Sequence, residues 1–256
     1  MMRAARRTSA VAVGGSLAAL TVLAGQARYT VRRDLPSMVG SDASGVEVGG
    51  AGATKTVRLG AVGDSTLTGP GLDDSAAIWV RRVARSVADL EQVDVEVVSF
   101  AVGGSRVRDV LESQLDAVIA SAPHVVLVAV GTNDAIHCTP LGRFERDFGL
   151  LICRLVDRVP AVVIGGLGDL AGIARVPFPL GAALAARGRR VNSVIRSIAA
   201  QHSLHYVDIS SVDRAFRVGG AGVFSLDLFH PDEHGHALWA NAAAPVVAHA
   251  IRGLDC

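Results

Sequence analysis

The sequence predicts an α/β fold in which a five-stranded parallel sheet lies between two layers of helices. From Thr56 onward, short apolar segments alternate with segments that carry apolar residues at helical spacing. Half of the 256 residues are hydrophobic, which is enough to bury one sizeable core. The apolar run 125–130 has no polar alternation, as expected of a strand covered on both faces. A single three-layer α/β/α domain over residues 56–256 is therefore expected.

The elements of this domain can be assigned in order. The predicted strands are "VRLGAV" (57–62), "VDVEVVSF" (93–100), "VVLVAV" (125–130), "AVVIGG" (161–166) and "LHYVDI" (204–209). The predicted helices cover about 75–90, 107–118 and 144–155, a long stretch ending near 202, and a last stretch from about 232. Right-handed crossovers between such strands bury the sheet between helices, so the strands are expected to be parallel.

Two segments precede the domain. Residues 1–33 place arginines before and after the uncharged stretch 8–27, a pattern typical of an export signal or an N-terminal membrane anchor. Residues 34–55 are small, polar and rich in glycine, which favours a flexible linker. The protein is therefore expected to be secreted or associated with the cell envelope, with 8–27 as a possible membrane tether.

Composition argues against several other functions. The net charge of +1 gives no basic face, so a nucleic-acid partner is not expected. Aromatic residues make up 4% of the chain, so stacking platforms for bases or long sugars are not expected to dominate. Cys138, Cys153 and Cys256 are widely spaced and show no metal-like pairing. In an exported protein a Cys138–Cys153 disulfide is conceivable, and free buried thiols fit equally well.

Polar residues and glycines follow four of the predicted strands. Ser65 comes after the first strand, Gly104 after the second and Asn133 after the third, while Asp227 and His230 follow the fifth. In an open parallel sheet the carboxyl ends of the strands form the ligand-binding edge. Nucleophilic acyl transfer needs such a set of groups at one edge: a hydroxyl, a backbone N–H without a side chain beside it, an amide, an imidazole and a carboxylate.

The blocks that carry these residues resemble the GDSL or SGNH hydrolase family. They are "GDS" (63–65), the glycine after the second strand, "GTND" (131–134) and "DLFHP" (227–231), in the family's order, and the resemblance spans about 57–240. The second block reads "AVGGSR", where the family often has a serine before the key glycine. Gly103 and Gly104 are therefore both candidates for that position.

The resemblance implies a flavodoxin-like SGNH fold and a role for each residue. Ser65 would be the nucleophile, His230 the base and Asp227 the acid that orients it. The backbone N–H groups of Ser65 and Gly104 and the side-chain amide of Asn133 would form the oxyanion hole. No cofactor and no metal are implied.

The chemistry supports these roles independently. A serine hydroxyl needs an adjacent base, and an imidazole can accept and return a proton near neutral pH. Pro231 favours an extended backbone at His230, just before the last helix. Asp227, three residues earlier, can then reach the other ring nitrogen. Asp134 is expected to hold its loop rather than to take part in catalysis.

Three other interpretations compete with this one. "HPDEHGH" offers His230, His234 and His236 with Glu233 nearby, which suggests zinc, but positions 234 and 236 of a helix point in different directions. "GGLGDLAG" (165–172) resembles a dinucleotide-binding turn, but Pro177 and Pro179 soon block a helix, so a loop near the active site is expected. A non-catalytic exported binding module is the third.

The sequence therefore predicts an exported or membrane-tethered serine hydrolase of carboxylic esters. The alternative is an acyltransferase or deacetylase that acts on a cell-envelope sugar or lipid. The loops 135–145, 167–180 and 213–226 are apolar and glycine-rich, which suits a short or lipid-like acyl group.

Overall fold

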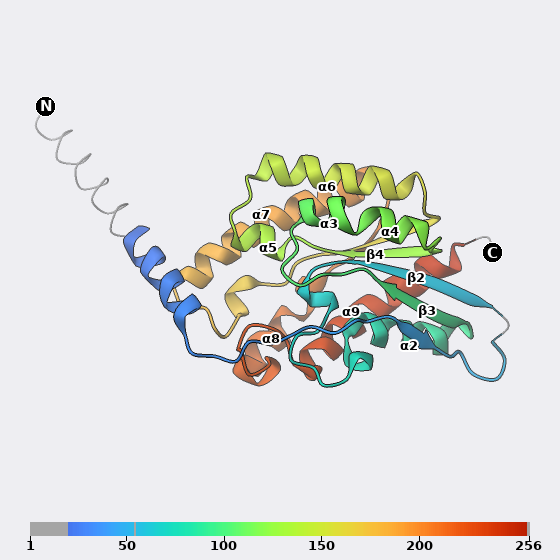
Figure 1. Ribbon diagram of the computed structural model, residues 1–256, viewed down its shortest axis with the longest axis horizontal. Helices are drawn as coiled ribbons and strands as arrows, with labels where there is room; N and C mark the ends of the chain where they lie inside the picture. The colour runs from blue at the N-terminus through green and yellow to red at the C-terminus, as the bar shows by residue number, and fades with distance from the viewer. Residues whose placement is uncertain (1–19, 54, 255–256) are drawn as a thin grey trace, which may run out of the picture.

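The computed structural model describes residues 20–53 and 55–254, and it confirms the three-layer α/β/α architecture (Figure 1). The strands are β1 (Gly45–Glu47), β2 (Thr56–Gly63), β3 (Asp94–Ser99), β4 (Val125–Ala129), β5 (Ala161–Gly165) and β6 (His205–Val207). They form one sheet in the order β1-β3-β2-β4-β5-β6. β2 to β6 are parallel and match the five predicted strands, whereas β1 was not predicted and pairs antiparallel with β3.

Helices cover both faces of the sheet (Figure 1). One layer contains α2 (Trp79–Glu91) and α9 (Glu233–Arg252), with α8 (Asp213–Gly219) beside them. The other contains α3 (Val107–Ser113), α4 (Leu115–Ala120), α5 (Thr132–Ile136), α6 (Leu141–Val156) and α7 (Leu180–Gln201). The helix predicted over 107–118 is interrupted at Gln114, and the short α5 and α8 were not predicted.

Within the described residues, five short 3-10 helices lie in the loops between these elements. They are η1 (Ser65–Leu67), η2 (Ser75–Ala77), η3 (Leu170–Gly172), η4 (Ile209–Val212) and η5 (Gly220–Val223). Four of them begin after an aspartate whose side chain accepts a backbone N–H of the new turn. Such capping by aspartate fixes where a loop turns, and in η1 it fixes the position of Ser65.

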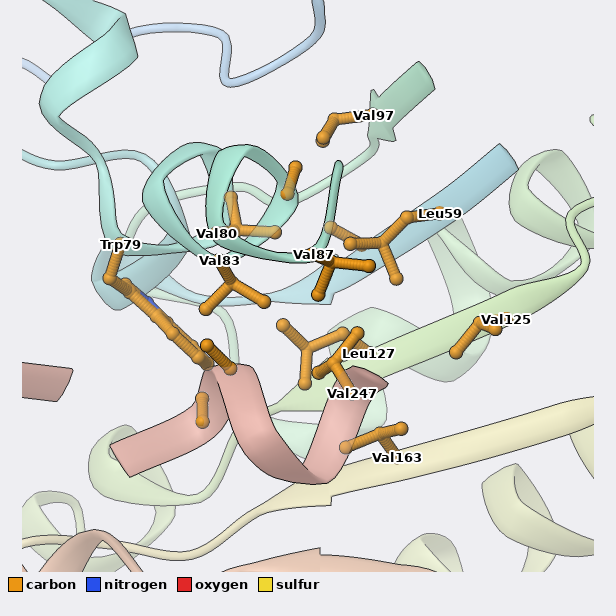
Figure 2. Close-up of a cluster of buried hydrophobic side chains, with 14 of the residues drawn as sticks. Leu59, Trp79, Val80, Val83, Val87, Val97, Val125, Leu127, Val163 and Val247 are labelled. Atoms are coloured by element: carbon orange, nitrogen blue, oxygen red, sulfur yellow. The ribbon is translucent and has the colours of Figure 1, made fainter. Parts of the chain in front are cut away.

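Two hydrophobic cores hold the layers together. Leu59 of β2 and Leu127 of β4 point toward α2 and α9, where they meet Val83 and Val247 (Figure 2). The second core lies between the sheet and α3, α4, α6 and α7, with Phe148 among its fully buried side chains. Burying each such side chain stabilises the fold by about 1.5–3 kcal/mol. The carboxyl ends of the strands are thus held on a rigid base.

The segment expected to be a flexible linker, 34–55, is partly packed onto the domain, which corrects that expectation. Besides forming β1, it buries Ala43 completely. The buried Glu47 receives two hydrogen bonds from Arg81, at 2.6 and 2.9 Å, and two from Arg85, at 2.9 and 3.4 Å. Two arginines compensate for the burial of this carboxylate, which would otherwise be costly. The segment therefore has a fixed place beside β3.

The expected export signal or anchor, 1–33, lies largely outside the described residues. Residues 20–32 are helical. Gln26 in this helix donates to the carbonyl of Phe178 at 2.7 Å and accepts from the N–H of Leu180 at 2.9 Å. Within 20–53 and 55–254, no helix is long and apolar enough to cross a membrane. Export or anchoring through the N-terminal segment stays a prediction.

The cysteines correct the expected disulfide, and they correct the expected burial of the free thiols. Cys138 and Cys153 are both free, so no disulfide joins them, and both are exposed rather than buried. Cys138 follows α5 in a left-handed backbone conformation, with φ of 54°. Cys256 lies outside the described residues. The two described thiols therefore contribute no crosslink to the fold.

Candidate active site

Ser65 lies directly beyond the carboxyl end of β2, where the chain turns sharply. Gly63 has φ of +154°, and a Cβ there would overlap the carbonyl oxygen of Ala129 on β4, so only glycine fits. Asp64 then caps η1 by accepting the N–H of Thr66 at 3.0 Å. Ser65 is the first residue of η1 and is half-buried. The turn thus displays the serine hydroxyl at the edge of the sheet.

Gln114 holds this turn from below, and sequence reasoning missed it. Its side chain accepts the N–H of Gly63 at 2.8 Å and donates to the carbonyl of the same residue at 2.9 Å. It also donates to the hydroxyl of Ser105 at 3.1 Å. The side chain is buried at the break between α3 and α4. A polar residue within an apolar helical pattern is only a weak sequence signal, so this clamp could not be anticipated.

Asp64 lies beneath the site and is 1% exposed. Burial raises the pKa of its carboxyl to about 6, although hydrogen bonds from Thr66 and Asn133 oppose that shift. The Nδ2 atom of Asn133 lies 3.4 Å from Asp64 Oδ2 and 3.2 Å from the carbonyl oxygen of Ser105. Both contacts are long for an N–H···O hydrogen bond. The amide is therefore held in position, and its hydrogens are only weakly engaged.

Gly103 and Gly104 form the turn beside the serine. A Cβ at Gly103 would lie 3.9 Å from the Cβ of Ser65, whereas Gly104 has φ of +82° and open space around it. Within the described part of the chain, the backbone N–H groups of Ser65, Gly103 and Gly104 donate no hydrogen bond. The glycines thus leave unpaired donors beside the serine, as a developing negative charge would require.

His230 and Asp227 form a closely bonded pair. The Asp227 carboxylate lies 2.6 Å from His230 Nδ1 and also accepts the backbone N–H groups of Phe229 and His230 at 2.9 and 3.0 Å. Burial acts to raise the pKa of Asp227, but these hydrogen bonds outweigh it and the pKa is lowered. An ionised Asp227 fixes a proton on Nδ1 and leaves Nε2 free to act as a base.

The loop that carries the pair is itself well supported. Ser225 donates its N–H to the carbonyl of His230 at 2.8 Å, and its hydroxyl lies within hydrogen-bond distance of the carbonyls of Pro70, at 3.4 Å, and Pro231, at 3.2 Å. Asp232 then caps α9 by accepting the N–H of Gly235 at 2.9 Å. As predicted from Pro231, His230 comes just before the last helix. These contacts tie the histidine loop to the turn after η1.

A narrow apolar pocket extends from Ser65 and His230 into the domain. It has a volume of about 110 Å³. Both tryptophans and three of the seven phenylalanines line it, although aromatic residues are scarce in the chain. Phe216 stacks on Trp239, with ring centroids 5.7 Å apart, and Trp79 meets Trp239 edge-on at 6.4 Å. We call this cavity the inner pocket; loops 167–173 and 213–224 contribute to it, and 135–145 does not.

A wider groove of about 790 Å³ opens on the other side of the serine. It contains the candidate oxyanion donors Gly104 and Asn133 and is also bordered by residues 38–42, which precede the sheet. We call it the outer pocket. Ser65, Phe229 and His230 line both pockets. The predicted site residues are therefore brought together at one edge of the sheet, between two cavities of different character.

The residues of the rival interpretations lie elsewhere or have other partners. His236 is fully buried, and its Nδ1 accepts the N–H of Trp79 at 3.2 Å. Burial lowers the pKa of His236 to about 3. His234 is exposed. No group of three histidine, cysteine, aspartate or glutamate side chains able to hold a metal occurs within 20–53 and 55–254. The loop 165–173 lines the inner pocket.

Asp134 has a structural contact of its own. Its Oδ2 accepts the N–H of Val107, the first residue of α3, at 2.9 Å. The loop after β4 is thereby tied to the helix that follows the glycine turn. Burial raises the pKa of Asp134. Its carboxylate supports the loops around the site and lines neither pocket.

A serine, a carboxylate-bound imidazole and unpaired backbone N–H groups at the carboxyl edge of a parallel sheet are typical of serine hydrolases with an α/β fold. The GDSL-like lipase/acylhydrolase family model matches residues 61–238, well over half of the chain. The chain belongs to this family.

Known proteins agree with this assignment. The GDSL-like esterase Rv1075c of Mycobacterium tuberculosis (strain ATCC 25618 / H37Rv) is 27% identical in an alignment that covers 92% of this chain and 81% of that protein. The acetylxylan esterase Axe2 of Geobacillus stearothermophilus superposes with a TM-score of 0.60 at 20% identity, over 77% of this chain and 95% of that one. LAE5, an α/β hydrolase from the metagenome of Lake Arreo, Spain, superposes with a TM-score of 0.63 at 20% identity. The superposition covers 77% of this chain and 96% of that one. The two structural likenesses show the shared fold.

Proposed function

We propose that the protein is a serine esterase that cleaves carboxylic esters of short acyl chains through an acyl-enzyme on Ser65. The observation that carries this proposal is the 2.6 Å contact between Asp227 and His230 Nδ1, in a loop that borders the same two pockets as Ser65. This contact orients a base next to a serine that lies on a tight turn, and nucleophilic catalysis requires such an arrangement.

In the first step, His230 Nε2 takes the proton of the Ser65 hydroxyl as Oγ attacks the ester carbonyl carbon. The ionised Asp227 stabilises the imidazolium that forms. The tetrahedral intermediate collapses as His230 returns the proton to the leaving alcohol. Water then repeats the sequence on the acyl-enzyme and releases the acid. Among the described residues, no hydrogen bond joins Ser65 and His230, and such bonds often tighten only when substrate binds.

The oxyanion would lie against the backbone N–H groups of Ser65 and Gly104 and the amide of Asn133. The two N–H groups have no partner in the described part of the chain, so they need not break a bond to reach the oxyanion. Asn133 would turn one weakly held hydrogen away from Asp64 or Ser105. Donors of this kind are each worth about 10²–10³ in rate.

The inner pocket suits the acyl chain because it is apolar and lined by aromatic rings, among them the stacked Phe216 and Trp239. An apolar cavity of about 150 Å³ can hold a benzene ring of six carbons, so the 110 Å³ of this pocket suggests about four carbons. The structural relative Axe2 is an acetylxylan esterase and so removes a short acyl group. A short-chain ester is therefore the proposed substrate.

The test is the loss of activity and of labelling in Ser65→Ala. Hydrolysis of nitrophenyl esters from acetate to palmitate should be fastest for the short chains and should fall at least about 10⁴-fold in the variant. A fluorophosphonate should label the wild type and fail to label the variant. Ser211→Ala, an exposed serine that lines neither pocket, is the matched control and should keep both properties.

Undiminished labelling of a folded Ser65→Ala protein would move the nucleophile elsewhere and refute the mechanism. The same assay with a sugar acceptor distinguishes hydrolysis from acyl transfer. An ester of the acceptor would form in place of the free acid if the protein were a transferase.

A further inference from the structure

The outer pocket has a wall that the family domain does not supply. Residues 38–42, which we call the strap, line this pocket together with Ser65, Gly104 and Asn133. The family model begins only at residue 61, so the strap lies outside it. In Figure 1 the chain before β1 runs across the molecule from the N-terminal helix toward β3. A segment specific to the N-terminal part of this chain therefore borders the reacting serine.

The strap is held firmly where it passes the site. Ser41 donates its N–H to the carbonyl of Thr68 at 2.7 Å, just after η1. Gly40 lies so close to Thr68 that a Cβ would overlap the threonine hydroxyl oxygen. On the downstream side the chain is fixed by β1 and the buried Glu47 with its arginines. A wall that is ordered before substrate arrives costs little entropy on binding.

The chain is also held upstream of the strap. Arg175 donates to the carbonyl of Thr30 at 3.1 Å, and Arg33 donates back to the carbonyl of Arg175 at 3.5 Å. The N–H of Arg175 in turn bonds the carbonyl of Leu228 at 2.8 Å, in the loop of the catalytic pair. The strap is thus fixed at both ends beside the active site, upstream by the contacts of Arg175 and downstream by β1.

The strap brings two exposed polar side chains, each with an oxygen that has no partner within the described part of the chain. Asp42 accepts from Ser44 through Oδ1, and its Oδ2 has no hydrogen-bond partner among the described residues. The Ser41 hydroxyl is likewise unpaired there. Phe100 and Phe229, both half-buried, offer apolar faces in the same pocket. Charged and hydroxyl acceptors beside aromatic faces fit a ring that carries several hydroxyl groups.

We propose that the strap forms the alcohol-binding half of the active site and selects esters whose alcohol is a carbohydrate. The proposal rests on the function given above, with the acyl chain in the inner pocket. Asp42 and Ser41 then bind free hydroxyls of the sugar, while one esterified hydroxyl lies at Ser65. The volume of the outer pocket, about 790 Å³, leaves room for a sugar ring.

The test compares two acetate esters that differ only in the alcohol, 6-O-acetylglucose and ethyl acetate. The readout is the ratio of their kcat/KM values, with acetate release measured for both. Asp42→Asn keeps the acceptor for Ser44 and removes the charge, so the ratio should fall about tenfold, as expected for the loss of a hydrogen bond to a charged group. Asp34→Asn, an exposed carboxylate of the same segment that lines neither pocket, should leave the ratio unchanged.

A second variant tests the position of the strap rather than its charge. Gly40→Ala forces the backbone away from Thr68 and should lower the same ratio by a similar factor. Gly52→Ala introduces a methyl group with nothing within 4 Å and is the matched control. An unchanged ratio in both Asp42→Asn and Gly40→Ala would overturn the proposal.

The chain-length profile of nitrophenyl esters gives an independent check. If the strap variants shift the preferred acyl chain and not the sugar ratio, the outer pocket holds the acyl group and the proposal is wrong. These outcomes differ from a failure of the esterase function itself, because that failure would appear as activity retained in Ser65→Ala.

Discussion

The two pockets beside Ser65 are built in different ways. The inner pocket is narrow and is lined by rings from α2, α8 and α9, so its shape follows from the packing of the domain. The outer pocket is wider, and the strap forms part of its wall from a segment outside the family domain. On the proposed assignment of the pockets, an alteration of the strap changes the alcohol preference and leaves the hydrophobic core, and with it the acyl preference, the same.

The residues that line both pockets are expected to act on every substrate. Ser65, Phe229 and His230 border both cavities, and the rings of Phe229 and His230 meet edge-on with centroids 4.9 Å apart. A change at the catalytic residues should therefore affect every ester, whatever its acyl chain or alcohol. A change in one pocket should affect only the part of the substrate that it holds.

The largest effect is expected at the catalytic pair. His230→Ala removes the base and should lower kcat about 10⁴-fold or more for every ester, and Asp227→Ala, which loosens the ring and removes its charge support, should cost no more. The measurement is kcat on short and long nitrophenyl esters. His234→Ala, an exposed histidine of the same segment, is the control and should remain active.

Full activity in Asp227→Ala would contradict the role of that carboxylate. In that case a backbone carbonyl would orient the imidazole, and the site would work as a Ser–His dyad. A loss confined to one acyl length or one alcohol would contradict the common position of the pair between the pockets.

The second effect concerns Asp64, which lies beneath the site and lines neither pocket. Because its pKa rises from 3.8 to about 6 on folding, the folded protein retains a proton that the unfolded chain releases between these pH values. Stability is therefore lost as the pH rises through that window. Compared with Asp64→Asn, the wild-type free energy of unfolding should fall by about 2 kcal/mol between pH 4 and pH 7.

Urea denaturation at several pH values measures this difference. Asparagine also caps a turn well, so the variant should fold. Asp89→Asn, at an exposed carboxylate of α2, is the control. A difference that does not change with pH would mean that Asp64 is not held in its protonated form. A change in the ratio of sugar to ethyl acetate hydrolysis would mean that Asp64 contacts the substrate.

The sequence predicted the core of this architecture because strong local signals agree with the fold. β4 and β5 are short apolar runs, and each of the five parallel strands lies within a few residues of its predicted place. The site residues come directly after those strands, so strand topology alone brings Ser65, Gly104 and Asn133 to one edge. The 2.6 Å contact of Asp227 with His230 follows from their spacing and Pro231.

The strand β1 and the lining of the inner pocket were not predicted, because they depend on contacts between distant segments. Residues 46–48 alternate valine and glutamate, but Val46 and Val48 are exposed and Glu47 is buried, the reverse of the usual pattern. Only the arginines of α2 make that arrangement stable. The aromatic lining of the inner pocket likewise combines residues from Trp79 to Trp239, and no local spacing reveals that they meet.

The smallest effect is expected in the inner pocket, where Ile173 is a half-buried side chain of the lining. Ile173→Ala lengthens the cavity by removing part of its wall, so longer acyl chains should fit. Because one methylene in an apolar pocket changes discrimination by about tenfold or more, the ratio of kcat/KM for octanoate to butyrate nitrophenyl esters should rise about tenfold.

Leu184→Ala removes a half-buried leucine of α7 that lines neither pocket, so it controls for a general loss of packing. It should leave the octanoate-to-butyrate ratio unchanged. Ile173→Ala should also leave the 6-O-acetylglucose to ethyl acetate ratio unchanged, because that ratio depends on the strap. If Ile173→Ala instead altered the sugar ratio and not the chain-length ratio, the acyl group and the alcohol would occupy the opposite pockets.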